Sequence, residues 1–478
     1  MKSLLRSTTL LLGAATAALS AQTTKDAVVA RIDETKAAFE TTALKIWGFA
    51  EVGYKEKQSS ALLQEQLKAA GFTVEAGVAG IPTAFTATFG RGSPVIGILG
   101  EFDALPGVSQ AAVPERSPIA GQNAGHACGH HLFGAASAEA AVAVKEWMIA
   151  THQAGTIRFY GTPAEEGGSD KVYMVRAGLF NDVDVVLHWH PGDANAVTMT
   201  PSLANISGKF RFHGIASHAS ASPEKGRSAL DGVEAMDAMV NLMREHVPQE
   251  TRIHYVITRG GEAPNVVPAF AEVYYYVRHP SREQVKSIWE RVTDAARGAA
   301  LGTGTTVDWE ITGGTYDLLP NETLGRLMHA NLTRVGGVPY TADEKNFAAK
   351  INQTLLDKPQ PVENANVIQP FQPVLPPSGG STDVGDVSWV VPTVGLETAT
   401  WVPGTPAHSW QAVAAGGTAI GLKGMVVAAK VIALTAVDLF TQPATIAQAK
   451  AELAKHRGPD FKYAPLLGDR PPALNYRD

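Results

Sequence analysis

The chain has 478 residues, of which 45% are hydrophobic, 18% are charged and one is a cysteine. This composition excludes an intrinsically disordered chain, a collagen-like fibre and a disulfide-stabilised scaffold. The 40 basic and 46 acidic residues leave a net charge of −6, so no nucleic-acid partner is expected. The length predicts roughly two or three domains with an ample core.

The N-terminus has the pattern of a secretory signal. Lys2 and Arg6 give it a positive start, and a short apolar stretch, residues 9–21, ends in small residues. This stretch has about 13 residues, whereas a membrane-spanning helix needs about 20. We therefore expect residues 1–21 to be a signal peptide and the mature protein to be periplasmic or secreted. The alternative is a buried N-terminal helix.

The first third of the remaining chain has the pattern of a parallel α/β sheet. Apolar residues at helical spacing predict a helix over 25–50, and alanine-rich residues 134–148 predict another. Short apolar runs at 94–99, 156–160 and 183–187 predict buried strands, each followed by polar residues. Sites in such sheets form at the carboxyl ends of the strands.

The middle third changes to a second pattern. Four segments between residues 209 and 311 alternate strongly and are rich in β-branched and aromatic residues, and two predicted helices, 228–245 and 281–299, separate them. This pattern predicts a four-strand, two-helix α+β unit inserted into the larger domain. The first pattern resumes after residue 315.

The last third contains an irregular segment and a long apolar one. Residues 340–380 are rich in Pro and Asn, and most of this segment is predicted to be an irregular surface insertion. The apolar stretch 418–440 contains Lys423, Lys430 and Asp438, which favours a core helix over a membrane span, so no membrane partner is expected. A polar helix and a Pro-rich tail follow it.

The single cysteine lies in the motif Cys128-Gly129-His130. Thiolate and imidazole groups are metal ligands, and the glycine permits a close approach of the backbone. Metal binding would explain an unpaired thiol in an oxidising compartment. The alternative is a buried structural cysteine beside loop histidines.

Three further motifs carry candidate ligands or a base. Glu165 and Glu166 follow a predicted strand, and metal-dependent hydrolysis needs one carboxylate as ligand and another as base. His188 and His190 share one face after the next strand, and His408 lies between an apolar segment and a long helix. Singly, these residues fit a solvated acidic turn or structural histidines. Their joint position at strand ends and helix-entry loops of one predicted domain favours a metal site.

Together, these motifs resemble those of metallo-amidohydrolases related to aminoacylase, glutamate carboxypeptidase and the hydrolases of hippurate and auxin–amino-acid conjugates. The chain most resembles the p-aminobenzoyl-glutamate hydrolase branch, in its B-type subunit. The resemblance covers nearly the whole mature chain, and its specificity comes from the order of the motifs. The shared segments are, in chain order, 100–106, 128–130, 162–168, 261–268, 381–389 and 465–470.

The resemblance implies an α/β fold with a di-metal catalytic domain, in which helices flank a mixed, mainly parallel sheet. It also implies that the inserted four-strand, two-helix α+β unit is a lid or dimerisation domain, so a homodimer is expected. The expected boundaries are 1–21 for the signal peptide, 22–206 and 315–441 for the two parts of the catalytic domain, 207–314 for the lid, and 442–478 for a C-terminal helix and tail.

The resemblance further implies a centre of two divalent metal ions, zinc or manganese. Its expected ligands are Cys128, His130, Glu166, His190 and His408. Cys128 would take the bridging position, Glu165 would be the general base, and Asp103 would orient the ligands from behind. His190 is preferred to His188 because it holds the family position after the strand.

The inserted domain is expected to contribute substrate contacts. By the resemblance, His218 would stabilise the oxyanion, in many relatives from the partner subunit, and Asn265 and Arg278 would bind the polar end of the substrate. The alternative for Arg278 is a solvent-facing cation at a strand end. Two positions depart from the family pattern: His131 stands where relatives have Asp or Asn, and Glu101 stands where the wider superfamily has a metal-binding histidine.

The expected reaction is hydrolysis of the amide between an acyl or aroyl group and an amino acid, in a small-molecule substrate that carries a carboxylate. A dipeptidase or deacetylase of the same superfamily is the alternative. An alternative of another class is a non-catalytic periplasmic binding protein, which would lack a ligand or the base. The chain keeps all of these residues.

Overall fold

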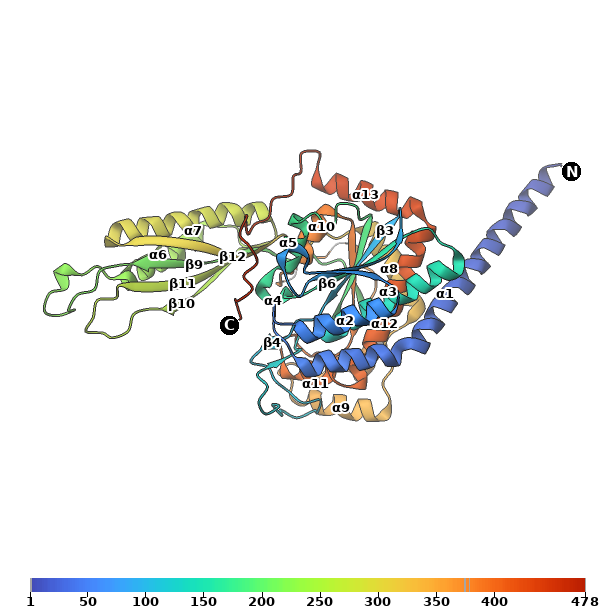
Figure 1. Ribbon diagram of the computed structural model, residues 1–478, viewed down its shortest axis with the longest axis horizontal. Coiled ribbons are helices and arrows are strands. Elements are labelled where there is room, and N and C mark those ends of the chain that lie inside the picture. The colour runs from blue at the N-terminus through green and yellow to red at the C-terminus, as the bar shows by residue number, and fades with distance from the viewer. Residues whose placement is uncertain (1, 374, 378, 478) are drawn as a thin grey trace.

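The computed structural model describes residues 2–373, 375–377 and 379–477, with side chains from residue 25 onward. Figure 1 shows a large α/β body and a smaller unit that extends from one side of it. We call the smaller unit, residues 204–315, the lid, because it is the inserted α+β unit expected from the sequence.

The sheet of the body has seven strands in the order β1-β2-β6-β3-β7-β13-β8. The four central strands are parallel, and antiparallel strands extend both edges, which confirms the expected mixed sheet. Strand β3 is buried along its whole length, as an apolar strand covered on both faces must be. The bounds are Thr73–Ala76 (β1), Phe85–Arg91 (β2), Val95–Glu101 (β3), Gly155–Thr162 (β6), Val185–Gly192 (β7), Ala196–Thr198 (β8) and Thr393–Ala399 (β13). A separate pair consists of Leu105–Pro106 (β4) and Ala124–Gly125 (β5).

Helices α1, α3 and α12 pack against one another, and α3 and α12 also contact strands of the sheet. The most apolar part of α12 could cross a membrane by length and composition, but it is 83% buried inside the protein, as expected for a core helix. The long helices of the body are Lys2–Phe49 (α1), Lys57–Ala69 (α2), His130–Thr151 (α3), Glu322–Val335 (α8), Ala419–Thr441 (α12) and Pro443–Arg457 (α13). The short ones are Glu165–Gly168 (α4), Asp170–Arg176 (α5), Ala342–Asn352 (α9), Val384–Val390 (α10) and Trp410–Gly416 (α11).

The expected signal segment, residues 1–21, corresponds to the start of α1. Met1 and the side chains of residues 2–24 lie outside the described part of the protein. Figure 1 shows this end of α1 projecting away from the body. The secretory signal therefore stays a prediction.

The lid is an antiparallel sheet in the order β10-β11-β9-β12, with α6 and α7 packed on one face. Its bounds are Ala204–His213 (β9), Ala229–Met243 (α6), Arg252–Arg259 (β10), Phe270–His279 (β11), Arg282–Thr303 (α7) and Thr306–Thr315 (β12). The four strands and two helices that the sequence predicts are confirmed. The core of the lid is separate from the main core of the body and combines apolar side chains of both helices with those of the sheet.

The segment 340–380 is mostly irregular, as expected, but it also contains a helix that was not predicted from the sequence. Helix α9 occupies 342–352. Thr341 and Glu344 form a complete capping box at its start, which satisfies two backbone N–H groups that the helix leaves free. The Thr-x-x-Glu spacing was visible in the sequence, and the high Pro and Asn content after it obscured the helix.

Candidate metal centre

The candidate ligands lie where the parallel strands end. Glu165 and Glu166 follow β6, and His190 lies near the end of β7. His408 lies between β13 and α11, and Cys128 lies two residues before the start of α3. Since the carboxyl ends of parallel strands meet at one edge of the sheet, segments far apart in the sequence converge there.

The structure brings all five predicted ligands together in two groups that share Cys128. One group is Cys128, His130 and His190, the other is Cys128, Glu166 and His408, and the ligand atoms within each group lie within 4.8 Å of one another. The Cys128 Sγ lies 3.3 Å from His190 Nε2. Glu166 Oε1 lies 3.1 Å from His408 Nε2. Cys128 is the one residue common to both groups.

Local backbone geometry makes this convergence possible. Gly129 has a φ of 76°, and a Cβ added to it would lie 2.5 Å from the Cβ of Pro191. Only glycine therefore lets the Cys128 loop approach the strand end that carries His190. His408 also has a positive φ, 61°, and its backbone N–H donates to the Ala127 carbonyl at 3.0 Å. Such strained non-glycine residues cluster at functional sites.

Hydrogen bonds fix the ring orientations of two candidate ligands. The Nδ1–H of His130 donates to Asp103 Oδ1 at 2.7 Å, and the Nδ1–H of His190 donates to the Pro191 carbonyl at 2.7 Å. Each bond leaves Nε2 as the nitrogen that can bind a metal. Burial and the neighbouring His130 lower the pKa of His190 to about 4, so this ring is neutral near pH 7.

The residues at this site fit a divalent metal centre. His130 Nε2 and Glu166 Oε1 are buried, and among the described residues each has a polar neighbour at 3.1 Å, Glu101 Oε2 and His408 Nε2 respectively, but no hydrogen bond of good geometry. A metal ion bound at this edge would satisfy both atoms. Thiolate, imidazole and carboxylate ligands together suit zinc and also manganese.

Asp103 lies behind the ligands and contacts both groups. One carboxylate oxygen accepts the hydrogen bond from His130, and the other accepts the backbone N–H of Glu166 at 3.0 Å. Burial opposes ionisation of Asp103, but the interaction with His130 outweighs it and lowers the pKa of Asp103. Asp103 thus holds a ring in one group and a backbone segment in the other.

Glu165 lies beside the ligands without belonging to the two groups. Its carboxylate, that of Glu101 and a ring nitrogen of His130 lie within 4.8 Å of one another. Burial raises the pKa of Glu165 well above its usual range, and the charges of Glu101 and Glu166 raise it further. A carboxyl group with a raised pKa can both take and return a proton near neutral pH.

Lys171 is a buried lysine behind the site, and nothing in the sequence indicated that it lies there. The Nζ of Lys171 lies 2.9 Å from Glu101 Oε1, 2.8 Å from Asp383 Oδ1 and 3.4 Å from Asp170 Oδ1. Burial opposes its charge, but these carboxylates raise the pKa of Lys171 well above its usual range. Glu101 therefore lies between the buried Lys171 ammonium group and the candidate ligand His130. Asp383 is 212 residues away in the chain, so no local pattern could reveal the cluster.

Two histidines whose roles the sequence left open lie outside both groups. The Nε2–H of His131 donates to the Gly416 carbonyl at 3.0 Å. The His188 ring packs against Gly395, where an added Cβ would lie 2.3 Å from the ring. Burial, followed by the charge of His190, lowers the pKa of His188 to about 3. Both side chains are buried and form part of the packing around the site.

The three lid residues predicted to contact substrate do not come together within one chain. His218 and Asn265 lie in adjacent loops, where the Ala219 N–H donates to the Asn265 carbonyl at 3.0 Å. Arg278 pairs with Asn205 at the opposite end of the lid sheet. Along β11, Arg278 is eight positions after Phe270, a distance of about 27 Å at about 3.4 Å per residue.

The loops that carry His218 and Asn265 lie at the free end of the lid. Figure 1 shows the β9–α6 and β10–β11 connections at the end remote from the body, whereas the opposite end of the lid sheet joins the body. His218 and Asn265 are exposed there. Arg278 is half-buried, and its guanidinium lies 5.3 Å from the centre of the Tyr276 ring.

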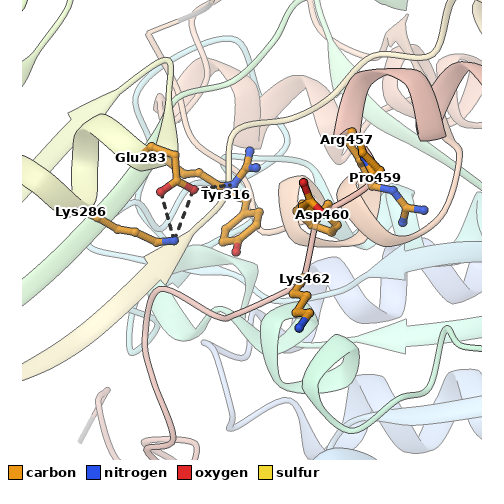
Figure 2. A pocket seen from close by; sticks show the side chains of 10 residues that line it. Glu283, Lys286, Tyr316, Arg457, Pro459, Asp460 and Lys462 are labelled. Carbon is orange, nitrogen blue, oxygen red and sulfur yellow. Dashed lines mark hydrogen bonds and ion pairs between the residues drawn. The ribbon is translucent and has the colours of Figure 1, made fainter.

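A cavity of about 430 Å³ lies elsewhere, at the junction of lid and body. Figure 2 shows that it is lined by the first turn of α7, including Glu283 and Lys286, and by the segment that follows α13. At this junction the Arg282 guanidinium lies 3.6 Å from the centre of the Trp389 ring. The cavity contains none of the predicted site residues.

The lid and the whole chain are similar to known proteins. Residues 204–303 match the peptidase dimerisation domain family. The chain is 42% identical over 447 residues to the B-type subunit of the p-aminobenzoyl-glutamate hydrolase of Escherichia coli, which covers 88% of this chain and 93% of the relative. It is 30% identical over 438 residues to the Xaa-Arg dipeptidase of Mus musculus, which covers 88% of this chain and 90% of the relative.

The fold is similar to that of a solved dinuclear metal-binding peptidase of the M20 family from Bacillus subtilis. The two structures superpose with a TM-score of 0.58 at 18% sequence identity, over 86% of this chain and 99% of the other. This likeness concerns the fold alone.

Proposed function

Because the chain belongs to the M20 peptidase family and is therefore a metal-dependent hydrolase of amide bonds, we propose that it cleaves the amide between an acyl or aroyl group and an amino acid. p-Aminobenzoyl-glutamate and N-acyl amino acids are the substrate types that this proposal names. The observation that carries it is the gathering of five ligand side chains beside the protonatable carboxyl group of Glu165.

The proposed metal centre has two divalent ions, zinc or manganese. Cys128, His130 and His190 would hold one ion, and Cys128, Glu166 and His408 the other. Bound there, such ions polarise an amide carbonyl and make an attacking water more acidic. Asp103 would hold His130 and the Glu166 backbone in place for binding.

The proposed chemistry of the protein's own groups is a proton transfer in two directions. Glu165 takes a proton from the attacking water and gives it to the nitrogen of the leaving amine. Its raised pKa favours holding that proton until the amine leaves. His218 would donate to the oxyanion that develops on the amide carbon, a contribution that typically changes the rate about 100- to 1000-fold.

We further propose that the active protein is a homodimer formed through the lid. Strand β10 is an edge of the lid sheet, and Val256 and Ile257 on it are exposed. Met239 and Leu242 on the neighbouring helix α6 are exposed as well. An apolar sheet edge of this kind favours pairing with a second copy. A second copy would also supply the His218 and Asn265 that this chain holds away from its own metal-binding edge.

Arg278 is the proposed partner of the substrate carboxylate. A guanidinium group binds a carboxylate through two parallel hydrogen bonds, and the Nε of Arg278 is buried without a partner among the described residues. Asn265 would contact the same polar end of the substrate from the second copy.

A dipeptidase is the second candidate, because the mouse relative at 30% identity is named as one. The two candidates share the metal centre and the base and differ in the substrate's acyl group. A panel of p-aminobenzoyl-glutamate, N-acyl amino acids and dipeptides, assayed with zinc- and manganese-loaded protein, separates them. Fastest turnover of a dipeptide would replace the first proposal with the second.

The role of Glu165 has its own test. Glu165→Gln should lose at least about 100-fold in turnover, because general acid–base catalysis contributes about 10²–10⁴-fold. It should keep its metal content, measured by elemental analysis, since Glu165 is not in either ligand group. Wild-type turnover of a metal-loaded Glu165→Gln protein would show that the base is another group.

We also propose that residues 1–21 direct secretion. The positive start and short apolar stretch support this, and removal would occur near Ala21. N-terminal sequencing of the protein recovered from the periplasm should begin near residue 22. Recovery of full-length protein only from the cytoplasm would contradict it.

A further inference from the structure

The loop that carries Glu165 and Glu166 has an unusual backbone. Ala164 and Ser169, which flank the short helix α4, both have a φ of 56°, in the left-handed region that non-glycine residues avoid. Glu166 itself has non-helical angles within α4. Such a conformation persists only where surrounding contacts enforce it.

Several hydrogen bonds to residues of the body hold this loop in its conformation. The Ala164 N–H donates to Glu56 Oε1 at 2.9 Å, and the Tyr54 hydroxyl donates to the Gly168 carbonyl at 2.8 Å. The N–H of Glu166 donates to Asp103. None of these three hydrogen bonds involves the carbonyl oxygen of Glu166.

The C-terminal tail supplies the missing contact. The Tyr476 hydroxyl donates to the Glu166 carbonyl at 3.0 Å, and Arg477 Nη2 donates to the same oxygen at 2.5 Å. The backbone of Glu166 is therefore held on one side by Asp103 and on the other by residues 310 and 311 positions later in the chain.

The body is shaped to receive Tyr476. A Cβ added to Gly53 would lie 2.0 Å from the Tyr476 hydroxyl, so the absence of a side chain at Gly53 provides the space. The Tyr476 ring packs edge-on against Tyr54, with ring centres 5.6 Å apart. Tyr54 in turn bonds the other end of the loop. The two tyrosines thus hold the carbonyls of Glu166 and Gly168 together.

The C-terminal tail contacts both the body and the lid before it reaches Glu166. Figure 1 shows the tail, in dark red, passing the junction between body and lid. Arg176 of the body donates to the carbonyls of Gly468 and Arg470, each at 2.9 Å. The guanidinium of Arg470 donates to the Thr312 carbonyl in lid strand β12.

We infer that Tyr476 and Arg477 are positioning residues that hold Glu166, and with it Glu165, in the arrangement needed for metal binding and proton transfer. The inference rests on the proposed roles of these two glutamates. It assigns the tail a part in the reaction that its distance in sequence from every ligand would not suggest.

Tyr476→Phe and Arg477→Met, singly and together, test this inference in the full-length protein. Turnover should fall about 3- to 10-fold for the tyrosine variant, which loses a neutral hydrogen bond, and at least about 10-fold for the arginine variant, which loses a charged one. KM should stay unchanged, because neither residue is proposed to bind substrate. Arg477→Lys should recover part of the loss. Asn475→Ala, an exposed tail position, is the matched control and should keep wild-type turnover.

Hydrogen exchange of the peptide containing residues 164–169 gives a readout that does not depend on activity. In the double variant its amides should exchange at least about 10-fold faster than in the wild type and in the Asn475→Ala control. If the wild-type protein hydrolyses nothing in the substrate panel, the proposed function fails while this exchange still tests the tail. Wild-type turnover together with unchanged exchange in the double variant would overturn the inference. If the double variant does not fold, Tyr476→Phe alone decides by the same two measurements.

Discussion

At the scale of single residues, Asp103 joins the two halves of the candidate metal centre. Its two oxygens contact a ring from one ligand group and a backbone N–H from the other. Its motif, Glu101-Phe102-Asp103, was found from the sequence, but its hydrogen-bond partners were not, because His130 begins helix α3 and Glu166 follows strand β6. A carboxylate in this position is expected to affect metal binding more than folding.

Asp103→Ala should reduce metal affinity or turnover about 10- to 100-fold, as the loss of an outer carboxylate typically does. Competition with a chelator measures the affinity, and initial rates measure the turnover. Asp182→Ala, which removes an exposed carboxylate near Arg158, is the control. Unchanged affinity and turnover in Asp103→Ala would remove this residue from the proposed site.

A second residue, Glu139, predicts how stability depends on pH. It is fully buried in α3, and burial, with the charge of Glu40, raises the pKa of Glu139 to about 8. The folded protein keeps this proton above the pH at which the unfolded chain releases it, near its ordinary pKa of 4.5. The stabilisation is therefore complete below about pH 4.5 and is lost as the pH rises towards 8.

Glu139→Gln should weaken this pH dependence. Between pH 5 and pH 8 the wild-type free energy of unfolding should fall by on the order of 3 kcal/mol more than that of the variant. Urea denaturation at both pH values measures the difference. Glu65→Gln, at an exposed position, should retain the wild-type dependence. Equal pH dependence in wild type and Glu139→Gln would contradict the prediction.

At the scale of elements, the close pairing of β7 and β13 explains why His190 joins the candidate ligands and His188 does not. Gly395 of β13 pairs with His188, and its missing side chain leaves the space that the ring fills. His190, two residues on, reaches the strand end, where Gly129 lets the Cys128 loop approach. The sequence placed both histidines on one face, and strand packing separated their surroundings.

Gly395→Ala should destabilise the protein by about 1–3 kcal/mol, because the added methyl group would overpack the buried His188 ring. Chemical denaturation measures the free energy of unfolding. Gly302→Ala in helix α7, where an added Cβ meets nothing within 4 Å, should keep or slightly raise the stability. Equal stability of the two variants would show that the strands can move apart at Gly395.

At the scale of the whole molecule, the length of the lid decides which residues can share a site. His218 and Asn265 lie at its free end, and Arg278 lies at the end that joins the body. A second copy that pairs through the lid could place the first two residues at the metal-binding edge of its partner. Sedimentation of the purified protein measures whether this chain forms a dimer by itself, and a monomer would contradict the proposed pairing.

Mixed dimers test whether His218 acts on the partner's site. Glu165→Gln and His218→Ala should each be nearly inactive alone, but after dissociation and reassociation in equal amounts about one quarter of wild-type activity should return. Half of the dimers would then be mixed, and each mixed dimer would contain one intact site. If the mixture stays inactive although mixed dimers form, His218 does not act across the interface.

The sequence by itself predicted the fold class and the inserted lid, because apolar periodicity is a local property of the chain. Its short motifs indicated the five candidate ligands through their resemblance to those of a known family. It missed helix α9 and could not supply the buried Lys171, the packing around His188 or the contact of Tyr476 and Arg477 with Glu166. These depend on side chains that meet across hundreds of residues, where burial and strand pairing, rather than spacing, decide which groups touch. Only the tertiary structure separated His218 from Arg278, because the strands of the lid hold them at opposite ends.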